Sequence, residues 1–376
     1  MTHLVIINDQ MHAMSSSSNV FYLLVRCSTD PSEDLTRSWS FMERKDIFPI
    51  LTAVIVIALV LAGEIIVTTD SHDDFSTSVT TDGNDVQITI ESRRPLVYTA
   101  VSLIDSLDTP KTVSVFYDKD YMSAAERGVA STGGRALDEN YYVEQIDATL
   151  KVRGIDYSEI VDAKGLAEIM SKDGRDNAVI VISGSLPDTV YDGTSDSLVL
   201  DWIGSGGRLY WIGGVLGKYI SHTDSIETVE SGTTLFLGSE CIDDTRIRGY
   251  DLIDNGFRDA FYIQSNLTTF GVDTSKLPKD VDYLSMGFTD GNRSSITVMG
   301  SGDGLVCVIG GEYTIRQRMD LAQMVASGIG PDTVIVDTTV GSVSGTDNVT
   351  LQKGDHIYVT IGGYFPVYAE GHEVTE

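Results

Sequence analysis

The residues best placed to do chemistry lie in four turns that follow apolar segments: Asp118, Ser183-Gly184, Gly213–Gly217 and Gly310-Gly311-Glu312. The segments before these turns are short, apolar and mostly β-branched, which is typical of strands buried in a parallel sheet. Ligands of open parallel sheets lie beyond the carboxyl ends of the strands, so we expect any site at these turns. The candidate ligand-binding residues are Ser183, Gly184, Gly213, Gly214 and Glu312.

A hydrolytic site is the second chemistry that these side chains allow. His222 follows Ser221 and precedes Asp224, and Ser183 ends a predicted strand. A serine, a histidine and an acid catalyse acyl transfer only when they converge in space, which sequence neighbours rarely do. A hydrolase that uses Ser183, His222 or carboxylates at the strand ends is therefore an alternative hypothesis.

The stretch Ala178–Lys218 predicts a strand, a helix and a second strand. Ala178–Ile182 is a continuous apolar run, and Leu198–Ile203 has apolar residues at helical spacing before Gly204–Gly207. Arg208–Gly214 then returns to an apolar strand. This order builds a parallel sheet, because a right-handed crossover brings the second strand beside the first.

The same alternation extends over residues 112–330. The predicted strands are Thr112–Tyr117, Ile155–Val161, Thr234–Leu237 and a hairpin of Ser295–Met299 with Leu305–Ile309. The predicted helices are Asn140–Val152, Leu166–Met170 and Tyr313–Ile329, whereas Ile242–Ser294 has no clear period. The predicted fold class is α/β, with a mostly parallel sheet flanked by helices.

Both ends of this region are predicted to be β structure. Val86, Ile88 and Ile90 alternate with polar residues, which is the period of a half-buried strand. After Pro331 come the short β segments Val334–Val336, Val349–Leu351, Ile357–Ile361 and Pro366–Tyr368. Because the ends of a domain often lie together, we expect residues 72–108 and 332–376 to pair into one small β-rich module.

The order of strands and turns in residues 112–329 resembles the class I glutamine amidotransferase-like (flavodoxin-like) fold. Active members of that family carry the nucleophile in a Gly-x-Cys-x-Gly elbow and the base in a late His-x-Glu. Here the elbow reads Gly213-Gly214-Val215-Leu216-Gly217, and the late turn reads Gly310-Gly311-Glu312. The resemblance therefore implies that Val215 replaces the cysteine and Gly310 the histidine. Neither residue can attack a carbonyl or take a proton, so it predicts a member without catalytic residues.

Each remaining candidate also has a structural explanation. Glu312 could cap the following helix, and Gly213-Gly214 could permit a sharp strand-to-helix turn rather than admit a phosphate. The acidic residues Asp243, Asp244, Asp251, Asp254 and Asp259 lack the glycine and glutamate of a 12-residue calcium loop, which favours a solvated face. No spacing of cysteine and histidine suggests zinc. We therefore expect neither a metal nor a cofactor.

The composition is strongly acidic. The 376 residues include 55 aspartates and glutamates but only 26 lysines and arginines, which gives a net charge of −29. Such a charge repels phosphate backbones, so nucleic acid is not an expected partner. It suits a solvated surface, a salty medium or divalent-cation binding, and the sequence does not separate these.

The segment Ile47–Val67 predicts a single membrane span. Its first seventeen residues, to Gly63, carry no charge, and Arg44 and Lys45 precede it. These features predict an anchor with a cytoplasmic tail, residues 1–46, and with the rest of the chain outside. A cleaved signal peptide is the alternative, and Met42 could be the true start of the chain.

Two kinds of residue bear on the exported location. Asn266, Asn292 and Asn348 begin glycosylation motifs, and all three lie beyond the apolar segment. Cys241 and Cys307 could form one external disulfide or stay as two buried thiols, while Cys27 precedes the segment.

Together these features predict a non-catalytic binding or scaffolding protein, anchored in the cell membrane with its main domain outside. Its partners would be the membrane and other envelope proteins. The alternatives are the cell-surface hydrolase described above and an accessory subunit of a membrane transporter.

Overall fold

The computed structural model describes residues 5–7, 22–24, 75–125, 139–152, 155, 157–242, 251–261, 263, 271–310, 315–362 and 366–373. Its contacts divide the chain into two units, Met1–His72 and Asp73–Glu376. In the first, β1 (Val5–Ile7) pairs antiparallel with β2 (Tyr22–Leu24). The predicted membrane segment 47–67 lies outside the described residues. Within the described ranges, no helix combines the length and the hydropathy that a bilayer span requires.

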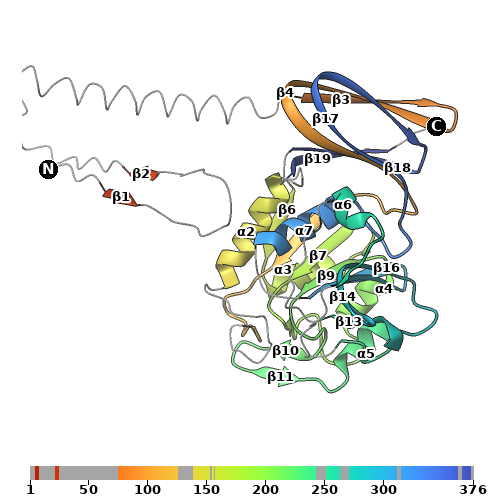
Figure 1. The fold of residues 1–376 in the computed structure, drawn as a ribbon. Helices are drawn as coiled ribbons and strands as arrows, with labels where there is room; N and C mark the ends of the chain where they lie inside the picture. The colour runs from red at the N-terminus through yellow and green to blue at the C-terminus, as the bar shows by residue number, and fades with distance from the viewer. Residues whose placement is uncertain are drawn as a thin grey trace, which may run out of the picture. The chain divides into compact units, whose positions relative to one another are not determined.

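The core of the second unit is a nine-stranded sheet in the order β12-β14-β15-β16-β9-β7-β5-β6, with β13 beside β15 (Figure 1). Its parallel strands are β5 (Thr112–Phe116), β6 (Ser158–Val161), β7 (Asn177–Val181), β9 (Arg208–Ile212) and β16 (Gly304–Ile309). In space they follow the order β6-β5-β7-β9-β16. This is the flavodoxin-like order, in which the second strand lies outside the first, and it agrees with the family resemblance predicted above.

The rest of the sheet is antiparallel. It consists of β12 (Asp251–Leu252), β13 (Val272–Asp273), β14 (Tyr283–Asp290) and β15 (Arg293–Ser301), and β15 forms the predicted hairpin with β16. The region Ile242–Ser294, which has no clear period, contains most of these strands together with a short 3-10 helix, η2 (Thr274–Lys276). Strands of two residues are too short to show an alternation in the sequence.

Helices cover both faces of the sheet. One face packs against α2 (Glu139–Val152), α6 (Phe257–Phe261) and α7 (Ile315–Ala326). The other packs against α3 (Ala163–Met170), α4 (Leu198–Gly204) and α5 (Gly232–Leu237). Along β7, Ala178 and Ile180 point to the first face and Val179 and Val181 to the second. This two-sided burial explains why the strand is an uninterrupted apolar run.

Two predicted elements are wrong. Thr234–Leu237 is not a strand but the end of α5, because so short an apolar run does not distinguish a strand from a helix by its period. The turn Gly213–Gly217 leads not into a helix but into β10 (Tyr219–Ser221). That strand joins β8 (Leu186–Pro187) and β11 (Ile226–Thr228) in a separate three-stranded sheet.

The two ends of the second unit form one antiparallel sheet, here called the β module. Its strands are β3 (Phe75–Asp82), β4 (Asp85–Ile104), β17 (Val334–Gln352), β18 (His356–Gly362) and β19 (Pro366–Glu373). The twenty-residue β4 pairs with β17 along one edge, and with β3 and then β18 along the other. The expected short segments 334–336 and 349–351 are parts of one strand, in which two register shifts absorb the curvature.

The β module shares a core with the α/β domain. Val101 and Leu103 of β4 and Tyr358 of β18 belong to the same buried cluster as the sheet and α7. At this junction Leu107 donates its backbone N–H to the carbonyl of Gly328 at 2.8 Å. Gly328 has a φ of 61°, and an added Cβ would lie 1.8 Å from the Leu107 oxygen. The junction therefore requires glycine after α7.

We predict that Gly328→Ala destabilises the protein by roughly 2–4 kcal/mol, because the left-handed conformation and the clash with Leu107 both cost free energy. Gly291→Ala is the matched control, since Gly291 has a φ of 64° and nothing within 4 Å of its added Cβ. It should cost only about 1–2 kcal/mol. Urea denaturation of both variants measures this, and equal losses would contradict the proposed close approach.

Candidate functional site

The expected site at the carboxyl ends of β7 and β9 is closed. Ser183 is 2% exposed, and Gly184, Gly213 and Gly214 are buried as well. The loop after β5 covers the end of β7: Ala125 donates its backbone N–H to the Ser183 carbonyl at 2.9 Å, and Ser123 Oγ donates to the same oxygen at 3.1 Å. These candidates therefore do not face a ligand in this conformation.

The side chains of the hydrolase hypothesis do not converge. Ser183 Oγ donates to the carbonyl of Ser185 at 2.5 Å. The two ring nitrogens of His222 contact carboxylates instead, with Nδ1 2.7 Å from Asp188 and Nε2 3.5 Å from Glu227. Neither ring nitrogen is therefore positioned to take a proton from Ser183.

The turn after β9 also lacks the strand-to-helix geometry of an amidotransferase-type elbow. Val215 is 8% exposed and Leu216 is fully buried, and β10 follows them where active members have a helix. Val215 borders a cavity of about 410 Å³ whose polar side chains include Lys218, Glu230 and Glu240, and neither histidine nor cysteine lines it. Without a following helix, the glycines do not form a phosphate site at a helix N-terminus. Gly310 donates its N–H to Ser295 at 2.8 Å, and Glu312 lies outside the described residues.

Of the two alternatives for Cys241 and Cys307, a disulfide or two buried thiols, the structure shows the buried thiols. Cys241 and Cys307 are both free and buried, and they belong to the clusters on opposite faces of the sheet. Burial raises the pKa of both thiols, which makes them less reactive. Of the predicted glycosylation positions, Asn292 and Asn348 are exposed, and Asn266 is outside the described residues.

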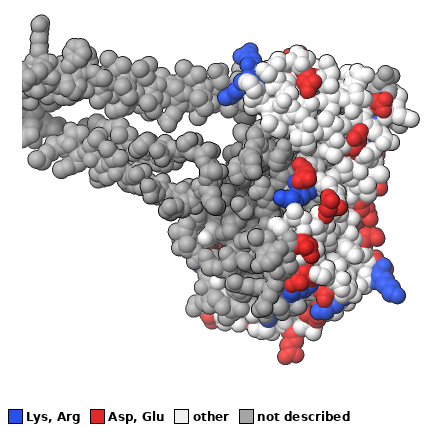
Figure 2. All heavy atoms as spheres, in the orientation of Figure 1, with Lys and Arg blue, Asp and Glu red and all other residues white. Residues whose placement is uncertain are grey.

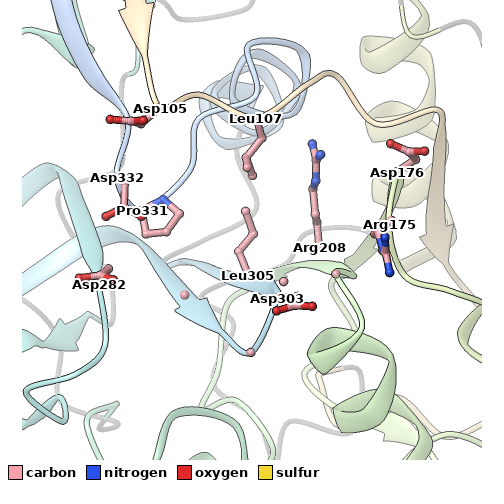
Figure 3. Close-up of a pocket in the computed structure, with 14 residues that line it drawn as sticks. Asp105, Leu107, Arg175, Asp176, Arg208, Asp282, Asp303, Leu305, Pro331 and Asp332 are labelled. Atoms are coloured by element: carbon pink, nitrogen blue, oxygen red, sulfur yellow. The ribbon is translucent and has the colours of Figure 1, made fainter.

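A pocket that the sequence analysis missed lies at the opposite, amino-terminal edge of the parallel strands. It has a volume of about 400 Å³ and is lined by residues before β7, β9, β14 and β17, by the β15–β16 turn and by the loop after β4. Figure 3 shows Asp105, Asp282 and Asp332 on one side of it, and Arg208 with Asp176 on the other. We call this cavity the junction pocket, because Asp105 and Asp332 come from the connections to the β module.

A Ser–His–Asp set beside the pocket ties the module to the domain. His356 Nδ1 is 2.8 Å from Ser106 Oγ, and Nε2 is 3.2 Å from Asp108 Oδ1. The Asp108 side chain is 73% exposed, whereas the orienting carboxylate of a catalytic triad is shielded from water. Ser106 does not line the junction pocket, although its neighbours Asp105 and Leu107 do. These hydrogen bonds join β18 to the loop after β4, which is a structural role.

Acidic side chains predominate in this chain, with 55 aspartates and glutamates against 26 lysines and arginines. Figure 2 shows aspartates and glutamates spread over the described part of one face. This distribution follows from the net charge of −29 and favours cationic over anionic ligands by long-range attraction.

Among the known proteins compared with this chain, the matches are to solved structures. No protein-family model and no curated protein matches the sequence. The GH42 beta-galactosidase Gan42B matches 66% of this chain and 34% of its own at 16% identity, with a TM-score of 0.38. The polyextremophilic beta-galactosidase from the Antarctic haloarchaeon Halorubrum lacusprofundi matches 68% of this chain and 34% of its own at 14% identity, with a TM-score of 0.35.

A third match is the cytoplasmic protein STM1381 from Salmonella typhimurium LT2, at 13% identity over 57% of this chain and 96% of its own, with a TM-score of 0.34. This chain thus spans about a third of the length of the two beta-galactosidases. Because the identities and TM-scores are low, the function proposed below is argued from the geometry of this chain.

The hydrogen bond that His222 Nδ1 donates to the Asp188 carboxylate raises the pKa of His222 above its ordinary value, and Glu227 adds a smaller contribution in the same direction. The charged ring therefore stabilises the fold below the ordinary pKa of about 6.5, and this contribution is lost as the pH rises through the folded-state pKa. We predict that Asp188→Asn lowers the pKa of His222 and that Glu227→Gln lowers it less. NMR titration of the ring Cε1–H measures both, and an unchanged pKa in Asp188→Asn would contradict the assignment.

Proposed function

We propose that this protein is a non-catalytic binding or scaffolding protein, anchored in a cell membrane with its α/β domain outside. The observation that carries the proposal is the closed carboxyl edge of the sheet. Val215 is at the nucleophile position, and the hydroxyl of Ser183 is bonded to the backbone of its own turn. Acyl transfer of the amidotransferase type needs a nucleophile within hydrogen-bond reach of a histidine, and the described residues at this edge include no serine or cysteine bonded to a histidine. Ser123 Oγ at this edge donates to the Glu139 carboxylate and to the Ser183 carbonyl instead.

The location outside the membrane is supported by the sequence and by two exposed side chains. The apolar segment 47–67 follows Arg44 and Lys45, which favours a cytoplasmic N-terminus. Asn292 and Asn348 begin glycosylation motifs at exposed positions, where a transferase could reach them. The net charge of −29 suits a well-solvated surface.

A hydrolase is the second candidate, because one observation favours it. Ser106, His356 and Asp108 are hydrogen-bonded in series, although the carboxylate is largely exposed. The hydrolase hypothesis requires a serine that acts as a nucleophile, whereas the binding hypothesis requires none.

The test of the non-catalytic reading is covalent labelling of the full chain with a fluorophosphonate probe, followed by peptide mass spectrometry. We expect adducts on neither Ser183 nor Ser106, because neither hydroxyl is paired with a histidine and a shielded carboxylate. A serine hydrolase labelled under the same conditions is the positive control. An adduct on either serine that disappears in the matching Ser→Ala variant would establish the hydrolase instead.

The test of the topology is amine labelling on intact cells with a membrane-impermeant reagent. Lys164, whose side chain is 85% exposed, should be labelled, whereas Lys45 should react only after lysis. Labelling of Lys45 on intact cells, or protection of Lys164, would contradict the proposed orientation.

A further inference from the structure

The loop after β5 closes the carboxyl end of β7 mainly with hydrogen bonds. We call its residues 119–125 the strap. Ser123, Ala124 and Ala125 are buried, but none of them belongs to the apolar clusters formed by the described residues. Tyr121 packs against one of these clusters and is only partly buried. A segment with so few apolar contacts opens at a lower free-energy cost than the core strands.

The strap supplies hydrogen-bond donors, and the strand end supplies acceptors. The backbone N–H of Ala125 and the Oγ of Ser123 donate to the Ser183 carbonyl at 2.9 Å and 3.1 Å. The backbone N–H of Ala124 donates to Ser185 Oγ at 3.2 Å. Water would replace each donor if the strap lifted, so opening exchanges these hydrogen bonds and leaves no acceptor buried without a partner.

A buried carboxylate holds the same segment. Glu139, the first residue of α2, is 2% exposed, and its carboxylate accepts a hydrogen bond from Ser123 Oγ. A carboxylate oxygen is a stronger acceptor than a carbonyl or a hydroxyl oxygen. The Ser123 hydroxyl is therefore the side-chain group that contributes most to keeping the strap closed.

The first half of the strap is anchored elsewhere. Tyr121 Oη donates to Asp188 Oδ1 at 3.1 Å, and the backbone N–H of Met122 donates to the His222 carbonyl at 3.0 Å. Asp188 follows β8, and His222 follows β10. Because these partners lie outside β7, residues 123–125 can lift while Tyr121 and Met122 stay in place.

We propose that the strap is a lid: residues 123–125 lift from Ser183, Ser185 and Glu139 while the sheet stays folded, and this uncovers the carboxyl end of β7. The closed strap is an autoinhibitory contact, because its own N–H and O–H groups occupy the acceptors at the edge where such sheets hold ligands. This inference rests on the proposed function, since it describes how a binding protein controls access to that edge.

The first experiment is hydrogen–deuterium exchange of the folded full chain, read residue by residue by mass spectrometry. The amides of Ala124 and Ala125 report on the strap, and those of Ile180 and Val181 report on β7. After correction for intrinsic rates, we expect the strap amides to exchange at least about tenfold faster than those of β7, because they open locally. Ser123→Ala should accelerate exchange in the strap by about a further tenfold and leave β7 unchanged.

The matched control for this variant is Ser195→Ala. Ser195 Oγ also donates to a carboxylate, that of Asp196 at 3.2 Å, but at an exposed turn outside the strap. This variant should change exchange in the strap by less than about twofold. Equal exchange of strap and β7 in the wild-type chain, or equal acceleration of both by Ser123→Ala, would overturn the proposal, because the strap would then open only with the sheet.

The second experiment asks whether opening uncovers the strand end. In a chain with Cys27→Ser, the thiol introduced by Ser183→Cys should react with iodoacetamide about tenfold faster when Ser123→Ala is added. The buried thiols of Cys241 and Cys307 should stay unlabelled, which shows that the sheet remains folded. An introduced thiol that reacts at the same rate with and without Ser123→Ala would contradict the lid.

Failure of the lid and failure of the proposed function give different results. A strap that exchanges only with β7 leaves the non-catalytic hypothesis intact. A serine adduct with the fluorophosphonate probe would refute the proposed function, whatever exchange and thiol labelling show.

Discussion

The fold depends on one long strand, β4, that belongs to two cores. Its first half packs Val86, Ile88 and Ile90 into the core of the β module, and its end packs Val101 and Leu103 into the core of the α/β domain. The module can therefore not pivot freely, because turning it would expose apolar side chains of both cores. The contacts of Gly328 with Leu107 and of His356 with Ser106 and Asp108 add directional bonds to this apolar junction.

This constraint explains why the pocket is at the amino-terminal edge of the sheet. The connections into and out of the module carry Asp105 and Asp332 to the edge where β7, β9 and β16 begin. At the other edge, the loop after β5 closes over Ser183, and Val215 and Leu216 fill the turn after β9. A flavodoxin-like sheet offers its carboxyl edge to ligands, and here that edge is covered around Ser183, with a separate cavity of about 410 Å³ beside Val215.

Strands buried on both faces were predictable from the sequence. Elements that are short or that show no clear hydrophobic period were not. The run around Ile180 and Val181 and the hairpin before α7 indicated their strands by composition and length. Thr234–Leu237 lacked the length that separates a helix from a strand, and the two-residue strands β12 and β13 left no period. The alternation of Val86, Ile88 and Ile90 predicted a strand but not its continuation to Ile104, since β4 changes partners along its length. The junction pocket was not predictable, because its residues lie in connections that meet only through strand pairing.

The central claim is that the carboxyl end of β7, where this class of sheet holds its ligands, is closed in this chain. The most direct measurement is a crystal structure of the full chain. We predict that Ser183 stays covered by the loop after β5, with its hydroxyl bonded to the Ser185 carbonyl. An open cavity at this edge, with Ser183 Oγ within hydrogen-bond reach of a histidine, would contradict it.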